Sequence, residues 1–122
     1  MRRYKVTVTT DGSGDATAYS PRISGKIVQV EYIKPGTASY TDGVDFTITG
    51  EATGVSIWAE SNVNATARRA PRQPTHTQAG VAATLDGTVA ALEPIGIAND
   101  RIKIVVAQGG ASKVGAFHFL VD

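Results

Sequence analysis

Apolar and polar side chains alternate over several short stretches of the chain. From Tyr4 to Thr9 every second residue is apolar, and the same period recurs in later stretches. These are residues 23–33, 46–49, 55–59, 101–106 and 114–121, with weaker signals at 81–85, 88–92 and 95–97. A period of two is that of a β-strand with one buried face. Asp-Gly pairs and other glycines separate the stretches and are typical of turns.

Two of these stretches lead to specific predictions about strand geometry. In the longest one, the alternation predicts that Val28 and Tyr32 lie on one face of a strand and Ile27 and Glu31 on the other. The last two stretches, separated by Gln108-Gly109-Gly110, are expected to pair as a C-terminal hairpin. At the other end of the chain, residues 1–10 are expected to form a strand that could also join the sheet of a neighbouring molecule.

Composition and length place these strands in one domain. Thr, Val and Ile far outnumber Leu and Met, and β-branched side chains pack better on a strand than on a helix. A chain of 122 residues suits a single domain that buries its own core. We therefore predict that residues 1–122 form one all-β domain, a β-sandwich or jelly-roll-like barrel of about seven or eight short strands.

Charge and cysteine content exclude several kinds of function. The chain has no cysteine, which excludes a disulfide framework, thiolate catalysis and a cysteine-based zinc site. A formal net charge of +1 provides no general attraction to nucleic acid or to an anionic membrane. No apolar run approaches the roughly 20 residues needed to span a membrane. We expect neither a nucleic-acid partner nor a membrane partner.

The titratable residues form no recognisable catalytic or metal-binding pattern. Of the two histidines, His118 lies in an alternating stretch and is expected to have a structural role. No Gly-x-Ser-x-Gly motif marks a hydrolase nucleophile. The segment Asp11–Asp15 superficially resembles a calcium loop, but it lacks the distant bidentate Glu and is interpreted as a turn. The sequence predicts no catalytic residue, no cofactor and no metal site.

Residues 61–80 interrupt the alternation and carry an unusual concentration of positive charge. They include two prolines and no acidic residue, together with Arg68, Arg69, Arg72 and His76. We interpret this stretch as a long loop or arm, because loops of this length in compact domains are usually functional or disordered. Arginine forms bidentate contacts with carboxylate and phosphate groups. The three arginines and His76 are therefore the candidate residues for contact with a partner, with a merely solvated loop as the alternative.

Five segments of strand and turn sequence carry a resemblance to a known group of proteins. They are Ile23–Tyr32, Asp42–Glu51, Pro71-Arg72, Ile102–Gly110 and Lys113–Phe117. Together they resemble the small β-rich structural proteins of tailed-bacteriophage virions. Within that group the resemblance implies a head decoration (cement) protein, a non-enzymatic module that binds the major capsid protein on the capsid exterior. It also implies a homo-oligomer, often a trimer, made in the bacterial cytoplasm. Another virion position, in the neck, tail or spike base, stays open.

Two further classes of function are open on the residues alone. A carbohydrate- or receptor-binding β-sandwich would need an exposed aromatic ring beside Asp or Asn. The candidates are Tyr40 with Asp42, or Trp58 with Asn62 and Asn64, although we expect Trp58 in the core. A hydrolase is the third class, and it has the least support because few titratable groups can converge.

Overall fold

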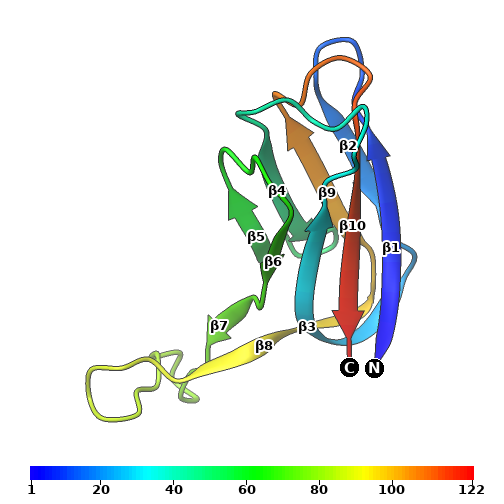
Figure 1. Cartoon of the computed structure of the whole chain (residues 1–122). Helices are drawn as coiled ribbons and strands as arrows, with labels where there is room; N and C mark the ends of the chain where they lie inside the picture. The colour runs from blue at the N-terminus through cyan, green and yellow to red at the C-terminus, as the bar shows by residue number, and fades with distance from the viewer.

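Ten strands arranged in two antiparallel sheets make up the molecule, and no helix is present (Figure 1). The computed structural model describes all 122 residues. The first sheet contains β1 (Arg2–Thr9), β3 (Ile23–Ile33), β6 (Ala67–Arg69), β7 (Arg72–Pro74), β8 (Leu92–Asp100) and β10 (Val114–Val121). The second contains β2 (Ala16–Tyr19), β4 (Asp45–Gly50), β5 (Ser56–Glu60) and β9 (Ile102–Ala107). The predicted all-β fold is confirmed, in the form of a β-sandwich.

The order of strands differs from the order in the chain. The first sheet runs β1-β10-β3-β8-β7, and β6 also pairs with β3; the second runs β2-β9-β4-β5. The count exceeds the predicted seven or eight strands because three short strands were not predicted: β2, and β6 and β7 within residues 61–80, which were expected to be a loop. The weak strand signals at residues 81–85 and 88–92 are wrong, since no strand forms between Pro74 and Leu92. The strands β6 and β7 are the shortest of the three. Each has three residues, which is too short for an alternating pattern to be recognised.

The predicted C-terminal hairpin is wrong. Strand β9 lies between β2 and β4 in one sheet, and β10 lies between β1 and β3 in the other. The connection over residues 108–113 therefore crosses between the layers. It is fixed there by backbone hydrogen bonds from Gly109 N to Gly14 O (2.8 Å) and from Thr41 N to Gly109 O (3.0 Å). The alternation marks both strands, but it carries no information about which sheet each one joins.

Strand β3 departs from strict alternation because it contains a bulge. Its partner β10 pairs with Gln29 and with Ile27 but passes over Val28. A bulged residue reverses the side to which the following residues point. Ile27 is therefore buried together with Val30 and Tyr32, contrary to the prediction, and Val28 is only half-buried.

Aromatic rings fill the centre of the space between the sheets. The ring of Phe46 lies 4.8 Å from that of Tyr32, 4.9 Å from that of Phe117 and 5.5 Å from that of Trp58, in edge-on arrangements. Tyr40 stacks on Tyr32 at 5.9 Å. Aromatic pairs in these geometries stabilise a core beyond the area that they bury. They belong to a single cluster of twenty buried hydrophobic residues contributed by both sheets.

The two buried tyrosines differ in how their hydroxyl groups are bonded. The Tyr40 hydroxyl donates a hydrogen bond to the carbonyl oxygen of Val8 at 2.6 Å. The Tyr32 hydroxyl is buried without a hydrogen-bond partner in the chain, and burial raises the pKa of Tyr32 to about 12.

We expect the substitutions Tyr40→Phe and Tyr32→Phe to have different effects on stability. Tyr40→Phe removes a buried hydrogen bond and should lower the free energy of unfolding by about 1 kcal/mol. Tyr32→Phe removes a hydroxyl that has no partner, so the free energy of unfolding should stay the same or rise. Urea unfolding of the two variants beside the wild type measures both values. Equal losses in the two variants would contradict this description of the core.

Candidate functional site

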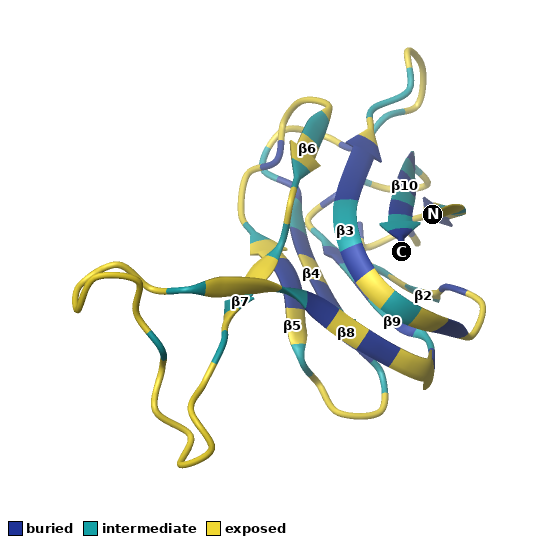
Figure 2. Ribbon diagram, turned by 90° about the horizontal axis from the view of Figure 1, so that it is seen from below, coloured by how far each residue is buried: buried dark blue, intermediate teal, exposed yellow.

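Residues 70–94 form an arm that projects from one side of the sandwich (Figures 1 and 2). The arm consists of β7, the first residues of β8 and the segment 75–91 between them. None of its residues is buried. The arm thus begins and ends later than the predicted loop of residues 61–80, whose first part packs on the sandwich as β6.

The arm leaves the sandwich at the point where two strands share one edge of β3. Strand β6 pairs with residues 30–32 of β3, and β8 pairs with residues 23–27. Between them the carbonyl of Val28, the bulged residue, accepts a hydrogen bond from Arg72 Nη1 at 3.1 Å. The same nitrogen donates to the carbonyl of Pro71 at 2.8 Å. Arg72 therefore fastens the base of the arm to the bulge of β3.

Two tight turns organise the outer part of the arm. In the first, Thr77 N donates to Val81 O at 2.8 Å, and in the second Leu85 N donates to Val89 O at 2.7 Å. The carboxylate of Asp86 accepts hydrogen bonds from the backbone of Val89 (2.9 Å) and Thr88 (3.1 Å). These bonds lower the pKa of Asp86, so the turn keeps its negative charge. The outer arm has a defined backbone although it has no core.

The four predicted contact residues are distributed along the arm and its base. Arg68 and Arg69 lie on β6, and Arg72 lies at the base of the arm. His76 is exposed in the outer arm, residues 75–91, where its backbone forms an isolated antiparallel β-bridge with that of Ala82. The structure does not bring them together into one cluster. Arg68 is the only one of the three arginines whose guanidinium donates no hydrogen bond within the chain; it lies 3.6 Å from Glu31, and its side chain is 70% exposed.

Arg69 connects the two sheets. Its Nε and Nη2 donate to the two carboxylate oxygens of Glu60 on β5, at 2.9 and 2.8 Å. Trp58 Nε1 donates to the same carboxylate at 3.0 Å, and the Arg69 guanidinium lies 5.6 Å from the centre of the Trp58 ring. The hydrogen bonds from Arg69, and then the one from Trp58, hold the pKa of Glu60 below its usual range. Arg69 is thus engaged within the molecule.

Substitution of Arg69 should therefore lower stability more than substitution of Arg68, whose ion pair with Glu31 is longer, at 3.6 Å, and includes no hydrogen bond. Arg69→Ala is expected to lower the free energy of unfolding by about 0.5–1 kcal/mol, the range of a partly exposed ion pair. It should also shift the fluorescence of Trp58, which loses its cationic neighbour. Arg68→Ala is the matched control on the same strand. An unfolding midpoint of Arg69→Ala equal to that of the wild type would show that the bonds between Arg69 and Glu60 contribute nothing.

An acidic residue that the sequence did not single out organises the outer face of the first sheet. Glu31 on β3 lies between Arg3 (3.7 Å) and Arg68 (3.6 Å) and is only 7% exposed. In the register of the sheet, His118 on β10 lies beside Glu31, and Lys5 on β1 lies beside His118. The Glu31 carboxylate thus pairs with two arginines, Arg3 and Arg68, and His118 lies beside it in the sheet. The alternation placed Glu31 on the face opposite Tyr32, but only the pairing of the strands brings in Arg3 and Arg68.

His118 has an environment that disfavours its charged form. Partial burial lowers its pKa, the charges of Arg3 and Lys5 lower it further, and Glu31 acts in the opposite direction. Its Nδ1 atom is buried without a hydrogen-bond partner in the chain. The predicted structural role of His118 agrees with this position within the sheet.

This environment predicts a pH dependence of stability. Because the pKa of His118 is lower in the folded state, the unfolded chain binds more protons as the pH falls through about 6.5, and stability decreases. The melting temperature should therefore fall between about pH 7.5 and about pH 5.5, and it should fall less for His118→Gln. Parallel pH profiles for the two proteins would rule out His118 as the cause.

The residues considered for other chemistry do not form a site. Tyr40 and Trp58 are 3% and 6% exposed, so neither presents the face of its ring to a sugar. The Asp11 carboxylate accepts hydrogen bonds from the backbone of Ser13 (2.8 Å) and Asp15 (3.1 Å). This geometry confirms the predicted turn. No group of three or more His, Cys, Asp or Glu residues is placed to hold a metal ion. No helix is long and apolar enough to cross a membrane.

Comparisons with known proteins give no further information on function, because no family model, no curated protein and no solved structure matches the chain. The arm and its base are therefore the candidate functional site on geometry alone.

Proposed function

We propose that the protein is a non-enzymatic structural component of a tailed-bacteriophage virion, most specifically a head decoration protein. Its partner in this proposal is the major capsid protein, and its place is the exterior of the capsid after synthesis in the bacterial cytoplasm. The observation that carries the proposal is the arm, an extension of the β-sandwich that contains no buried residue.

The chemistry of the arm supports docking to another protein. Four of the seven exposed large hydrophobic residues of the chain lie on it: Val81, Leu85, Val89 and Leu92. Between residues 75 and 91 the only charged side chain is Asp86. Exposed apolar side chains with few charges are typical of the centre of a protein interface. A decoration protein needs such an element because it must hold on to subunits that lie beside it.

The cationic residues at the base of the arm provide the polar border of that contact. Arg68 carries an exposed guanidinium, and Arg72 is exposed as well, while the exposed His76 lies further out on the arm. Charges at the border of an interface mainly guide association and set its register. In this proposal Arg68 and Arg72 face carboxylates of the capsid subunit; within the chain Arg72 donates side-chain hydrogen bonds only through Nη1. Arg69 has no such role, since it is bonded to Glu60.

Binding to capsids tests the proposal directly. Purified protein is mixed with phage heads that lack it and is then sedimented with them. The wild type should co-sediment with the heads, and the amount bound per head should reach a maximum as more protein is added. Arg68→Ser combined with Arg72→Gln should weaken binding roughly three- to tenfold, because it removes two positive charges from the contact. Gln is chosen at position 72 because its amide can still donate a hydrogen bond near the carbonyl of Val28.

A second charge-matched variant controls for net charge. Arg2→Ser combined with Lys113→Gln removes two positive charges away from the arm and should bind like the wild type. A wild type that stays in the supernatant would reject the decoration role and favour the neck, the tail or the spike base. Equal binding of all three proteins would remove Arg68 and Arg72 from the contact.

A further inference from the structure

The outer arm consists of two consecutive loops with related sequences. Residues 75–83, the first loop, have the sequence THTQAGVAA, and residues 83–91, the second loop, have the sequence ATLDGTVAA. When one is shifted by eight residues onto the other, their last three positions are identical, Val-Ala-Ala. Neither loop contains lysine or arginine.

The backbone repeats with the same shift of eight residues. In the first loop Thr77 N donates a hydrogen bond to Val81 O at 2.8 Å. The equivalent bond of the second loop joins Leu85 N to Val89 O at 2.7 Å. The isolated β-bridges that close the two loops are also at equivalent positions: His76–Ala82 and Thr84–Ala90. The two loops are therefore two copies of one backbone design.

Three backbone hydrogen bonds hold the loops at a common junction. Ala83 N donates to Thr75 O (2.9 Å), Ala91 N donates to Ala83 O (3.0 Å), and Thr75 N donates to Ala91 O (3.0 Å). These bonds form a closed ring of positions that are eight residues apart. The paired strands β7 and β8 enter the same junction from the sandwich. The arm therefore ends in a fork, and its two loops diverge (Figure 2).

Each loop presents a valine to solvent at the equivalent position. Val81 is 62% exposed and Val89 is 53% exposed. The second loop adds Leu85, which is 75% exposed, where the first has Thr77. Similar exposure at equivalent positions means that both loops offer the same kind of apolar contact.

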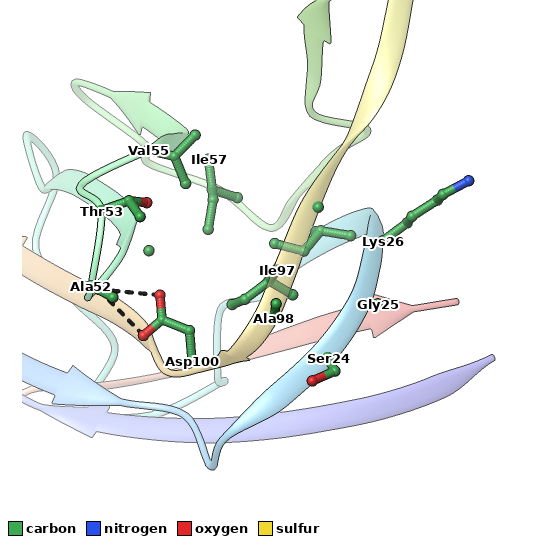
Figure 3. Close-up of a pocket in the computed structure, with 13 residues that line it drawn as sticks. Ser24, Gly25, Lys26, Ala52, Thr53, Val55, Ile57, Ile97, Ala98 and Asp100 are labelled. Carbon is green, nitrogen blue, oxygen red and sulfur yellow. Dashed lines mark hydrogen bonds between the residues drawn. The ribbon is translucent and has the colours of Figure 1, made fainter.

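The sandwich offers no surface that would cover these loops. Its largest hollow, of about 660 Å³, lies near the base of the arm, between β8 and the β4–β5 connection (Figure 3). The isoleucines in its lining are core residues and at most 9% exposed: Ile27, Ile57 and Ile97. Its carboxylate, Asp100, is already bonded to the backbone of Ala52 at 3.1 Å. The hollow belongs to the sandwich, and the loops stay in solvent until a partner covers them.

We infer that the two loops of one arm bind two neighbouring copies of the same partner subunit, one loop to each copy and both through the same small apolar pocket. Two equivalent surfaces fit two equivalent sites, whereas a single site would occupy one loop and leave the other exposed. The inference rests on the proposed function, since a capsid shell supplies identical subunits side by side.

The charge of Asp86 favours a protein partner over a lipid surface. Asp86 lies in the turn of the second loop, and hydrogen bonds from the backbone of Val89 and Thr88 lower its pKa. Inserting this loop into lipid would bury a charge without a counter-ion, which is costly. At a protein surface the carboxylate can stay in water beside the pocket.

Binding through two loops is stronger than binding through one, because the second contact forms within a complex that already exists. Linking two sites in this way raises affinity by roughly 10²–10⁴-fold over either contact alone. Loss of either loop should therefore have the same large effect on binding to an assembled shell.

The first experiment compares Val81→Asp with Val89→Asp in co-sedimentation with phage heads that lack the protein. Each variant should weaken binding by the same factor, roughly tenfold or more, and the double variant should not bind. Thr17→Asp adds the same charge at an exposed position of β2 and should bind like the wild type. The wild type should saturate at no more than one molecule for every two capsid subunits.

Photo-crosslinking identifies the sites directly and does not depend on the aspartate variants. Val81→p-benzoylphenylalanine and Val89→p-benzoylphenylalanine should crosslink to the same peptide of the capsid subunit. Crosslinks to two different peptides, crosslinks between two arms, unequal losses for the aspartate variants, or a higher saturating ratio would each overturn the inference while leaving the decoration role intact. A wild type that does not bind heads would reject the decoration role, and this inference with it.

Discussion

One edge of β3 is shared by two strands, and the shape of the molecule depends on that division. Strand β6 takes the hydrogen bonds of residues 30–32, and β8 takes those of residues 23–27. Between them the chain cannot continue along the edge, so residues 70–94 are directed away from the sandwich. The Val28 carbonyl that faces this gap is bonded by Arg72, in keeping with the rule that backbone polar groups in a packed structure find partners.

The three arginines near this edge of β3 have two different roles. Arg69 and Arg72 are used to hold the sandwich and the arm in place, while Arg68 keeps its guanidinium largely in solvent. The apolar side chains of the outer arm have no role in the core of their own molecule. A rigid sandwich that presents an exposed apolar extension is suited to assembly with other proteins, which is why we propose a role in the virion.

The sequence was informative about local structure and less so about long-range arrangement. Alternation identified β1, β3, β9 and β10, and Asp-Gly pairs identified turns. It could not reveal that β9 and β10 belong to different sheets, because that depends on which partners each strand finds. Nor could it locate the bulge at Val28, which shows only in the register with β10.

The candidate site was predicted in part for the same reason. The charge of residues 61–80 drew attention to Arg68, Arg69, Arg72 and His76. The partners of two of these arginines, Glu60 and the Val28 carbonyl, come from distant parts of the chain. Residues 75–80 of the outer arm were within the predicted loop, but residues 81–85 and 88–92 were interpreted as weak strands, and residues 81–91 form no strand. Their exposure becomes visible only once the sandwich is built.

The central claim is that the outer arm is covered by another protein when the molecule assembles. Hydrogen–deuterium exchange of the assembled and dissociated protein measures this directly. The account predicts that amides of residues 75–91 exchange rapidly in the free monomer and become markedly slower on assembly, while the core strands change little. Equally fast exchange of the arm in both states would contradict it.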